Sequence, residues 1–267
     1  MSTFWVPMAD GGLKIDWAKM PTYNTIMAVA VGAGLIGLVL LGRELLHAQE
    51  DVSTDGWGLA FGALGLILFT TGLHMTLTWP LAAGGFPFDN IIFGETSLAF
   101  GVLLGASGLY LWRRGPSLVG RGADASEDVT AGVATGARRA VPDPVTTLAR
   151  AAWPISIFIA GMGLGLFGIA AAGIRYQLFA APPQEPISGA FADYPLIEAI
   201  FMSGLIALVG LGAVLFPFAV RSLARPEGRR TALLTVIGWA WGIAGVVLGL
   251  FGALNYFTHI GLIINTM

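Results

Sequence analysis

The sequence predicts an all-α integral membrane protein, a bundle of six transmembrane helices. Hydrophobic residues make up 55% of the chain and charged residues 11%, a composition that excludes an ordinary water-exposed globular domain. An apolar stretch of about 20 residues matches the thickness of a bilayer core. Six such stretches follow one another along the chain, at 22–42, 58–78, 96–112, 153–173, 195–219 and 232–257.

The first three stretches lie in 22–112, which we interpret as a first three-helix half. The first stretch ends before Arg43. The second ends near Trp79, because the following Pro80 breaks a helix. Glu95 precedes the third stretch, and a carboxylate in the first turn of a helix is favoured by the helix dipole. The first half therefore contains a shaped loop between its second and third spans.

The rest of the chain gives a linker and a second half. Residues 113–150 are rich in Gly, Ala, Ser and Arg, which predicts a cytoplasmic linker, and 151–267 contain the last three stretches. Segment 1–21 carries four charged residues and lacks the apolar core of a signal peptide, so we expect an outer amphipathic segment there. The chain has no cysteine, which excludes disulfides and thiolate metal sites.

Positive charge predicts the orientation of the chain. Cytoplasmic loops carry an excess of Lys and Arg. The three connections on one side hold eleven arginines, whereas the other side holds Lys14, Lys19 and Arg175. Both termini are therefore expected outside. A net charge of −2 gives no reason to expect a nucleic-acid partner.

Two sequence patterns concern the packing of the helices. The segments Gly72–His74 and Phe88–Glu95 resemble Gly173–Arg175 and Phe191–Glu198, which predicts a parallel internal repeat. Alternatively, helix ends that face water on the same side simply use similar residues. Small residues also recur at helical spacing, which predicts close contacts between helices in lipid. These are Gly58 and Gly62, Ser97, Gly101 and Gly105, Gly161 and Gly165, Gly238 and Gly242, and Gly245 and Gly249.

Two histidines are the candidate ligands of a metal or a haem. His74 ends the second span and His259 follows the sixth, so both are expected at the outer face. With Glu95, Asp89 or Met75 added, they would form a nitrogen and oxygen site suited to copper, zinc or iron, and two histidines could instead ligate a haem. No short histidine spacing supports such a site. The alternative is a neutral histidine bonded to a carbonyl or a carboxylate.

A structural site in the outer loops is the second candidate. Trp79, Pro80 and Asn90 belong to the loop that returns from the second span to the third. Arg175 and Glu198 lie at the same depth in the second half, where an ion pair would tie two spans together. The spans lack ionisable residues near the bilayer midplane, which disfavours an ion-coupled transporter.

Residues 72–101 resemble a family of small prokaryotic multi-pass membrane proteins, the domain of unknown function 981. The resemblance rests on Gly72 to Met75, Trp79 to Leu81 and Asn90 to Glu95. It implies a protein of the prokaryotic inner membrane and assigns no activity. The function expected from the sequence is a non-catalytic accessory subunit of a larger membrane complex, handling electrons or small substrates, with other subunits and the lipid bilayer as partners. The alternatives are an outer-face metal- or haem-binding protein and a passive channel or facilitator.

Overall fold

Residues 23–47, 52–78, 88–119, 143–225 and 231–267 are described by a computed structural model, and their regular elements are all helical. Six helical segments are long and apolar enough to cross a membrane, which confirms the prediction of an all-α six-span membrane protein. The elements are α1 (Asn24–His47), α2 (Thr54–Leu77), the π-helix η2 (Asn90–Glu95), α3 (Thr96–Val119), α5 (Pro144–Tyr176), the 3-10 helix η4 (Ser188–Phe191), α6 (Pro195–Leu223) and α7 (Thr231–Thr266).

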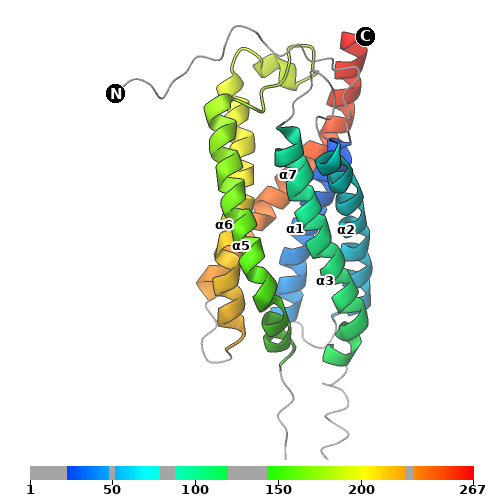
Figure 1. Cartoon of the computed structure of the whole chain (residues 1–267), viewed down its shortest axis with the longest axis vertical. Helices are drawn as coiled ribbons and strands as arrows, with labels where there is room; N and C mark the ends of the chain where they lie inside the picture. The colour runs from blue at the N-terminus through cyan, green and yellow to red at the C-terminus, as the bar shows by residue number, and fades with distance from the viewer. Residues whose placement is uncertain (1–22, 48–51, 79–87, 120–142, 226–230) are drawn as a thin grey trace, which may run out of the picture.

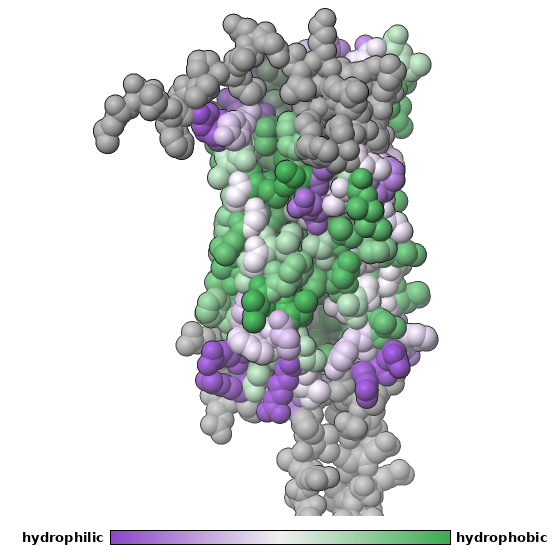
Figure 2. Space-filling model, viewed as in Figure 1, coloured by the Kyte–Doolittle hydropathy of each residue, from purple (hydrophilic) through white to green (hydrophobic). Residues whose placement is uncertain are grey.

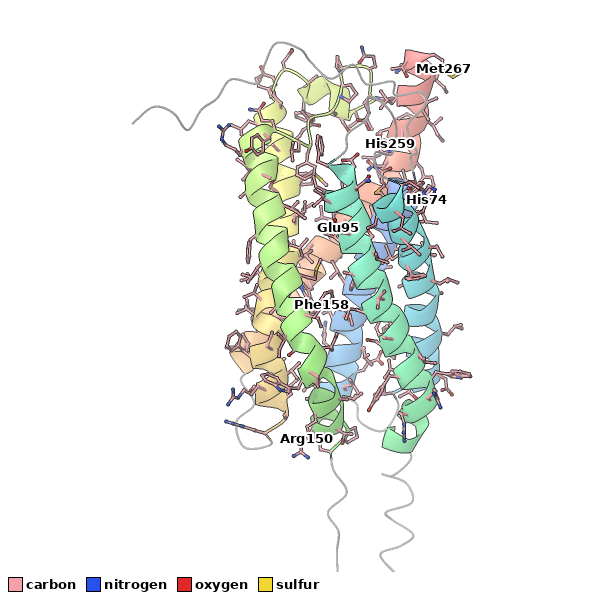
Figure 3. All side chains as sticks on the ribbon, viewed as in Figure 1. His74, Glu95, Arg150, Phe158, His259 and Met267 are labelled. Atoms are coloured by element: carbon pink, nitrogen blue, oxygen red, sulfur yellow. The ribbon has the colours of Figure 1, made fainter. Side chains whose placement is uncertain are left out.

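The long helices alternate in direction and form one elongated bundle (Figure 1). We call the end that carries His74 and His259 the His74 end, and the opposite one the Arg150 end (Figure 3). Hydrophobic side chains dominate the middle of the visible face, and hydrophilic ones gather at its Arg150 end (Figure 2). The described arginines other than Arg175 belong to helix ends on that side. The end that faces the cytoplasm stays a prediction.

Three helices extend beyond their apolar stretches. The third span begins at Asn90, where η2 leads directly into α3, and α7 continues to Thr266. The fourth begins at Pro144, because Asp143 caps it: its carboxylate accepts a 3.4 Å hydrogen bond from the Val145 backbone N–H. The placement of Glu95 in the first turn of the third span was therefore wrong. Glu198 does lie in the first turn of α6.

Close packing through glycine joins the helices in antiparallel pairs. A Cβ added to Gly108 of α3 would lie 2.7 Å from the carbonyl oxygen of Gly58 in α2. The corresponding distance from Gly163 of α5 to the Gly210 oxygen of α6 is 2.9 Å. At Gly32 of α1, an added Cβ would lie 2.5 Å from the backbone nitrogen of Gly249 in α7. Only glycine permits such approaches, so predicted contact glycines are confirmed in the α2–α3 pair (Gly58) and the α1–α7 pair (Gly249). The α5–α6 pair packs through Gly163 and Gly210, which were not predicted.

Some of the predicted contact glycines were wrong. An added Cβ would meet nothing within 4 Å at Gly161 and Gly165 of α5, nor at Gly238 and Gly242 of α7. On α5 the contact glycine is Gly163, which points to the opposite side. A glycine-rich helix has small residues on several faces, and spacing alone does not tell which face packs.

Helix α7 connects the other helices. It crosses the bundle obliquely and packs against both α6 and α1 (Figure 1). Trp241 anchors the first crossing, since its Nε1–H donates a 3.1 Å hydrogen bond to the Val209 carbonyl and its ring stacks on Phe216 at 5.8 Å. Helix α5, in contrast, touches α1 and α3 only sparsely. The α5–α6 pair is therefore held at a distance from the α2–α3 pair.

The helix pairs bear on the predicted organisation of the chain. The α2–α3 and α5–α6 pairs run the same way through the bundle, and each is joined at the His74 end, as a parallel repeat requires. The main partner of α1 is α7, from the other half of the sequence. Internal duplication, and the division into two three-helix halves, stay predictions. Segment 1–21 and most of the linker 113–150 lie outside the described residues.

Candidate ligand cavity

A cavity of about 440 Å³ lies between the separated helix pairs. This volume is within the range of about 300–1,000 Å³ that is typical of small-molecule sites. Most of its wall is apolar and comes from α1, α3, α5, α6 and α7. The wall includes Leu35, Leu104, Ile159, Met162, Phe216 and Trp241.

The loop between α5 and α6, residues 177–194, roofs the cavity at the His74 end. Several of its residues line the cavity, among them Phe179, Pro182 and Glu185. Gln177 adopts a left-handed conformation, with φ at 52°, and so ends α5 and turns the chain over the bundle. The roof is attached to α7, where Asn265 Nδ2 donates a 2.8 Å hydrogen bond to the carbonyl of Gln184.

The roof also contacts the start of the third span. The Phe179 ring packs edge-on against Phe93 of η2, with 6.5 Å between centroids. On α6, Glu198 Oε2 accepts a 2.7 Å hydrogen bond from the Ala181 backbone N–H. Contacts to η2, α6 and α7 therefore fix the roof on three sides.

The end of the cavity under the roof is polar. Its lining includes Asn24, Asp89, Glu185, Glu198, Asn255 and His259. Glu185 Oε1 lies 3.6 Å from His259 Nε2. Asn255 is only 7% exposed. These side chains come from α1, the η2 entry, the roof, α6 and α7, so distant parts of the sequence form one polar cap above an apolar chamber.

Burial raises the pKa of the two polar-cap carboxyl groups that lie outside the spans. It raises the pKa of Asp89 from 3.8 to about 7, because removal from water disfavours the charged form. Burial also raises the pKa of Glu185, and the nearby Thr258 hydroxyl acts in the opposite direction. Asn24 Oδ1 and His259 Nδ1 are buried and have no hydrogen-bond partner. The polar cap can therefore offer hydrogen bonds and negative charge to a bound molecule.

The predicted metal ligands are divided between the cavity lining and the exposed surface. His259 and Asp89 line the cavity. His74 is exposed and shares a 2.9 Å hydrogen bond with Tyr23 Oη, while Glu95 is exposed and does not border the cavity. In the described part of the chain, no three His, Asp or Glu side chains are placed to hold a metal ion. The structure thus does not assemble the predicted set as a copper or zinc site, and the two histidines contact different partners.

The residues of the predicted outer-loop site have separate surroundings. Trp79 and Pro80 lie outside the described residues. Asn90 is 3% exposed within the π-helix, and neither polar atom of its side chain has a hydrogen-bond partner. The Arg175 guanidinium lies 5.3 Å from the centroid of the Tyr176 ring, and Glu198 binds the roof. The ion pair between Arg175 and Glu198 stays a prediction.

Sequence reasoning missed three residues of the polar cap. These are Glu185, Asn24 and Asn255. Asn255 did carry a signal, since it is an amide inside the apolar stretch 232–257. A buried amide needs a partner, and here it faces the cavity.

Comparison with known proteins gives a family and no further relative. No curated protein and no solved structure matched the chain. One family model matches residues 20–261, which include five whole spans, most of the sixth, the roof and the polar cap. The chain therefore belongs to the family described as Protein of unknown function (DUF981).

Proposed function

We propose that this protein is a non-catalytic, membrane-embedded binding protein that holds a small amphipathic molecule between its helix pairs. The observation that supports the proposal is the cavity of about 440 Å³, apolar along its length and polar under the roof. A molecule with an apolar body and a polar head would match both parts. Such pockets, with few polar groups that fix orientation, are typical of ligand sites.

The position of the cavity supports a ligand that comes from the bilayer. Its walls belong to five membrane-spanning helices, and α5 makes few contacts with α1 and α3 beside it. The ligand would reside at membrane depth, with its head at the His74 end. A chamber lined by Leu, Ile, Met and Phe side chains favours the burial of an apolar group and does not stabilise a fully polar solute.

Cavity filling tests the proposal. Ala99 of α3 lines the cavity, so Ala99→Trp would occupy it, whereas Ala106→Trp on the exposed side of the same helix is the matched control. Each variant is purified from membranes, extracted with organic solvent and analysed by mass spectrometry. We expect an amphipathic molecule with the wild type and the control that is depleted at least tenfold in Ala99→Trp. Identical extracts from all three folded proteins would contradict the proposal.

The accessory-subunit hypothesis is a second candidate and is compatible with ligand binding. Gly161, Gly165 and Gly168 of α5 are exposed, and an added Cβ would meet nothing within 4 Å there. Small residues at this spacing allow a helix of another subunit to approach closely in lipid. Purification from native membranes in mild detergent would show co-purifying chains, and their loss in Gly165→Leu would support this role. A lone protomer at every detergent strength would contradict it.

The facilitator alternative predicts an additional property. Proteoliposomes that contain the wild type would then release the captured molecule across the membrane, and Ala99→Trp would block the release. Binding without release would leave the binding role and reject the facilitator.

A further inference from the structure

The polar cap holds more carboxyl groups than basic groups. Asp89, Glu185 and Glu198 all border the cavity, and the charges of the two glutamates are close enough to interact. Among the described residues that border the cavity there is no Lys or Arg, and His259 is the one basic side chain. A neutral imidazole does not balance the charges of Glu185 and Glu198. The cap would therefore be completed by a cation from outside the chain.

The unpaired atoms of the cap also call for hydrogen-bond donors. His259 Nε2 faces Glu185, and a carboxylate accepts, so the proton of a neutral imidazole belongs on Nε2. Its Nδ1 is then an acceptor, and this atom is buried without a partner. The carbonyl oxygen Oδ1 of Asn24 is a second buried acceptor without a donor. A buried acceptor without a donor costs free energy, which points to a ligand that donates hydrogen bonds to these two atoms.

The described arginine at this end of the bundle does not supply the positive charge to the polar cap. At the His74 end, Arg175 is the described side chain with a fixed positive charge. Its guanidinium lies over the Tyr176 ring, and neither residue borders the cavity. The described residues thus place two unpaired acceptors in the cap and leave the positive charge to the ligand.

We propose that the ligand of the cavity is an ammonium group on an apolar chain. The ammonium lies between Glu185 and Glu198, within reach of the unpaired acceptors of Asn24 and His259, and the chain extends along the apolar wall towards Trp241. This assignment rests on the proposed binding function and names its ligand class. A protonated amine brings several N–H donors for the two unpaired acceptors and the positive charge that the lining lacks. A free alkylamine and an ethanolamine lipid share this chemistry.

Matched ten-carbon probes test the assignment. The full-length protein in a neutral maltoside detergent is titrated calorimetrically with decylammonium, decanol and decanoate, which differ only in the head. We expect decylammonium to bind at least about tenfold more tightly than decanol, as charge-assisted hydrogen bonds are stronger than neutral ones. Decanoate should bind most weakly. Lysophosphatidylethanolamine is added as a fourth probe, and tighter binding than decylammonium would identify a lipid as the source.

Carboxyl variants locate the effect. Glu185→Gln combined with Glu198→Gln should remove the preference for decylammonium and leave the decanol affinity within about twofold. Glu95→Gln is the matched control, because Glu95 is an exposed acid at the same end that does not border the cavity. If the double variant elutes as aggregate, Glu185→Gln alone replaces it, and the preference should fall at least threefold.

The outcomes separate the two proposals. Equal affinities for decylammonium and decanol would overturn the ammonium assignment and keep the binding function. The same conclusion would follow if Glu95→Gln lowered the preference as much as the cap variants. No binding of any probe, even to protein freed of lipid, would overturn the binding function itself. Tighter binding by either amine-bearing probe, lost in the cap variants, supports the assignment.

Discussion

Asp89 should make the stability of the ligand-free protein depend on pH. Burial raises its pKa from 3.8 to about 7, so the folded protein favours the protonated carboxyl. The stabilisation from proton binding is complete below the unfolded-state pKa, near pH 3.8. It is lost as the pH rises to about 7 and stays constant above that. At about 1.4 kcal/mol per pKa unit, the loss amounts to about 4 kcal/mol.

The variant Asp89→Asn isolates this contribution, because an amide resembles the protonated carboxyl and does not ionise. Near pH 4 the variant and the wild type should have similar stability. At pH 8 the variant should be more stable by up to about 4 kcal/mol, which corresponds to roughly 10 °C in Tm for a chain of this size. The stability of Asp89→Asn should therefore change less with pH than that of the wild type. Burial of Glu185 gives a contribution of the same sign to both proteins, which cancels in their difference.

Thermal unfolding in neutral detergent, followed by tryptophan fluorescence at several pH values between 4 and 8.5, measures the effect. Asp193→Asn is the control, since Asp193 is an exposed acid at the same end and its loss should leave the curve unchanged. A Tm difference between Asp89→Asn and the wild type that is constant across this range would refute the reasoning. So would a wild type that becomes more stable than Asp89→Asn as the pH rises.

Three further predictions concern the scaffold. Gly101→Ala should destabilise the protein by about 1–3 kcal/mol, because its Cβ would meet the backbone of Phe69, while Gly105→Ala four residues on should be neutral by thermal unfolding. Equal effects of the two would contradict the α2–α3 contact. Trp241→Phe should cost about 1 kcal/mol through the lost hydrogen bond of 3.1 Å, and an unchanged Tm would argue against that bond. Asn265→Ala should speed protease cleavage in the roof, whereas unchanged digestion would mean that this hydrogen bond does not hold it.

The architecture was predictable because the bilayer imposes it. Apolar length determines a span, and the clustering of arginines predicted that all but one of the described ones would lie at one end. The helix ends were less predictable. The π-helix that starts at Asn90 carries polar residues that an apolar window excludes, and Asp143 starts α5 through a cap outside the apolar stretch.

The site was predictable only in part, because it depends on contacts between distant segments. His259 and Asp89 were identified and do line the cavity, whereas His74 and Glu95 point elsewhere. The side of a helix end on which a residue lies depends on the crossing angle of α7 and the path of the roof. Hydropathy and residue spacing predict neither the crossing angle nor the path of the roof. For the same reason, spacing gave the presence of glycine contacts and not always the correct face.

The most direct test of the proposed function is an experimental map of the full-length protein purified in mild detergent from the cells that express it. We expect continuous elongated density between Leu104, Met162 and Trp241, with its head against Glu198. Helix α5 packed directly against α3, with no chamber and no density, would contradict a binding role.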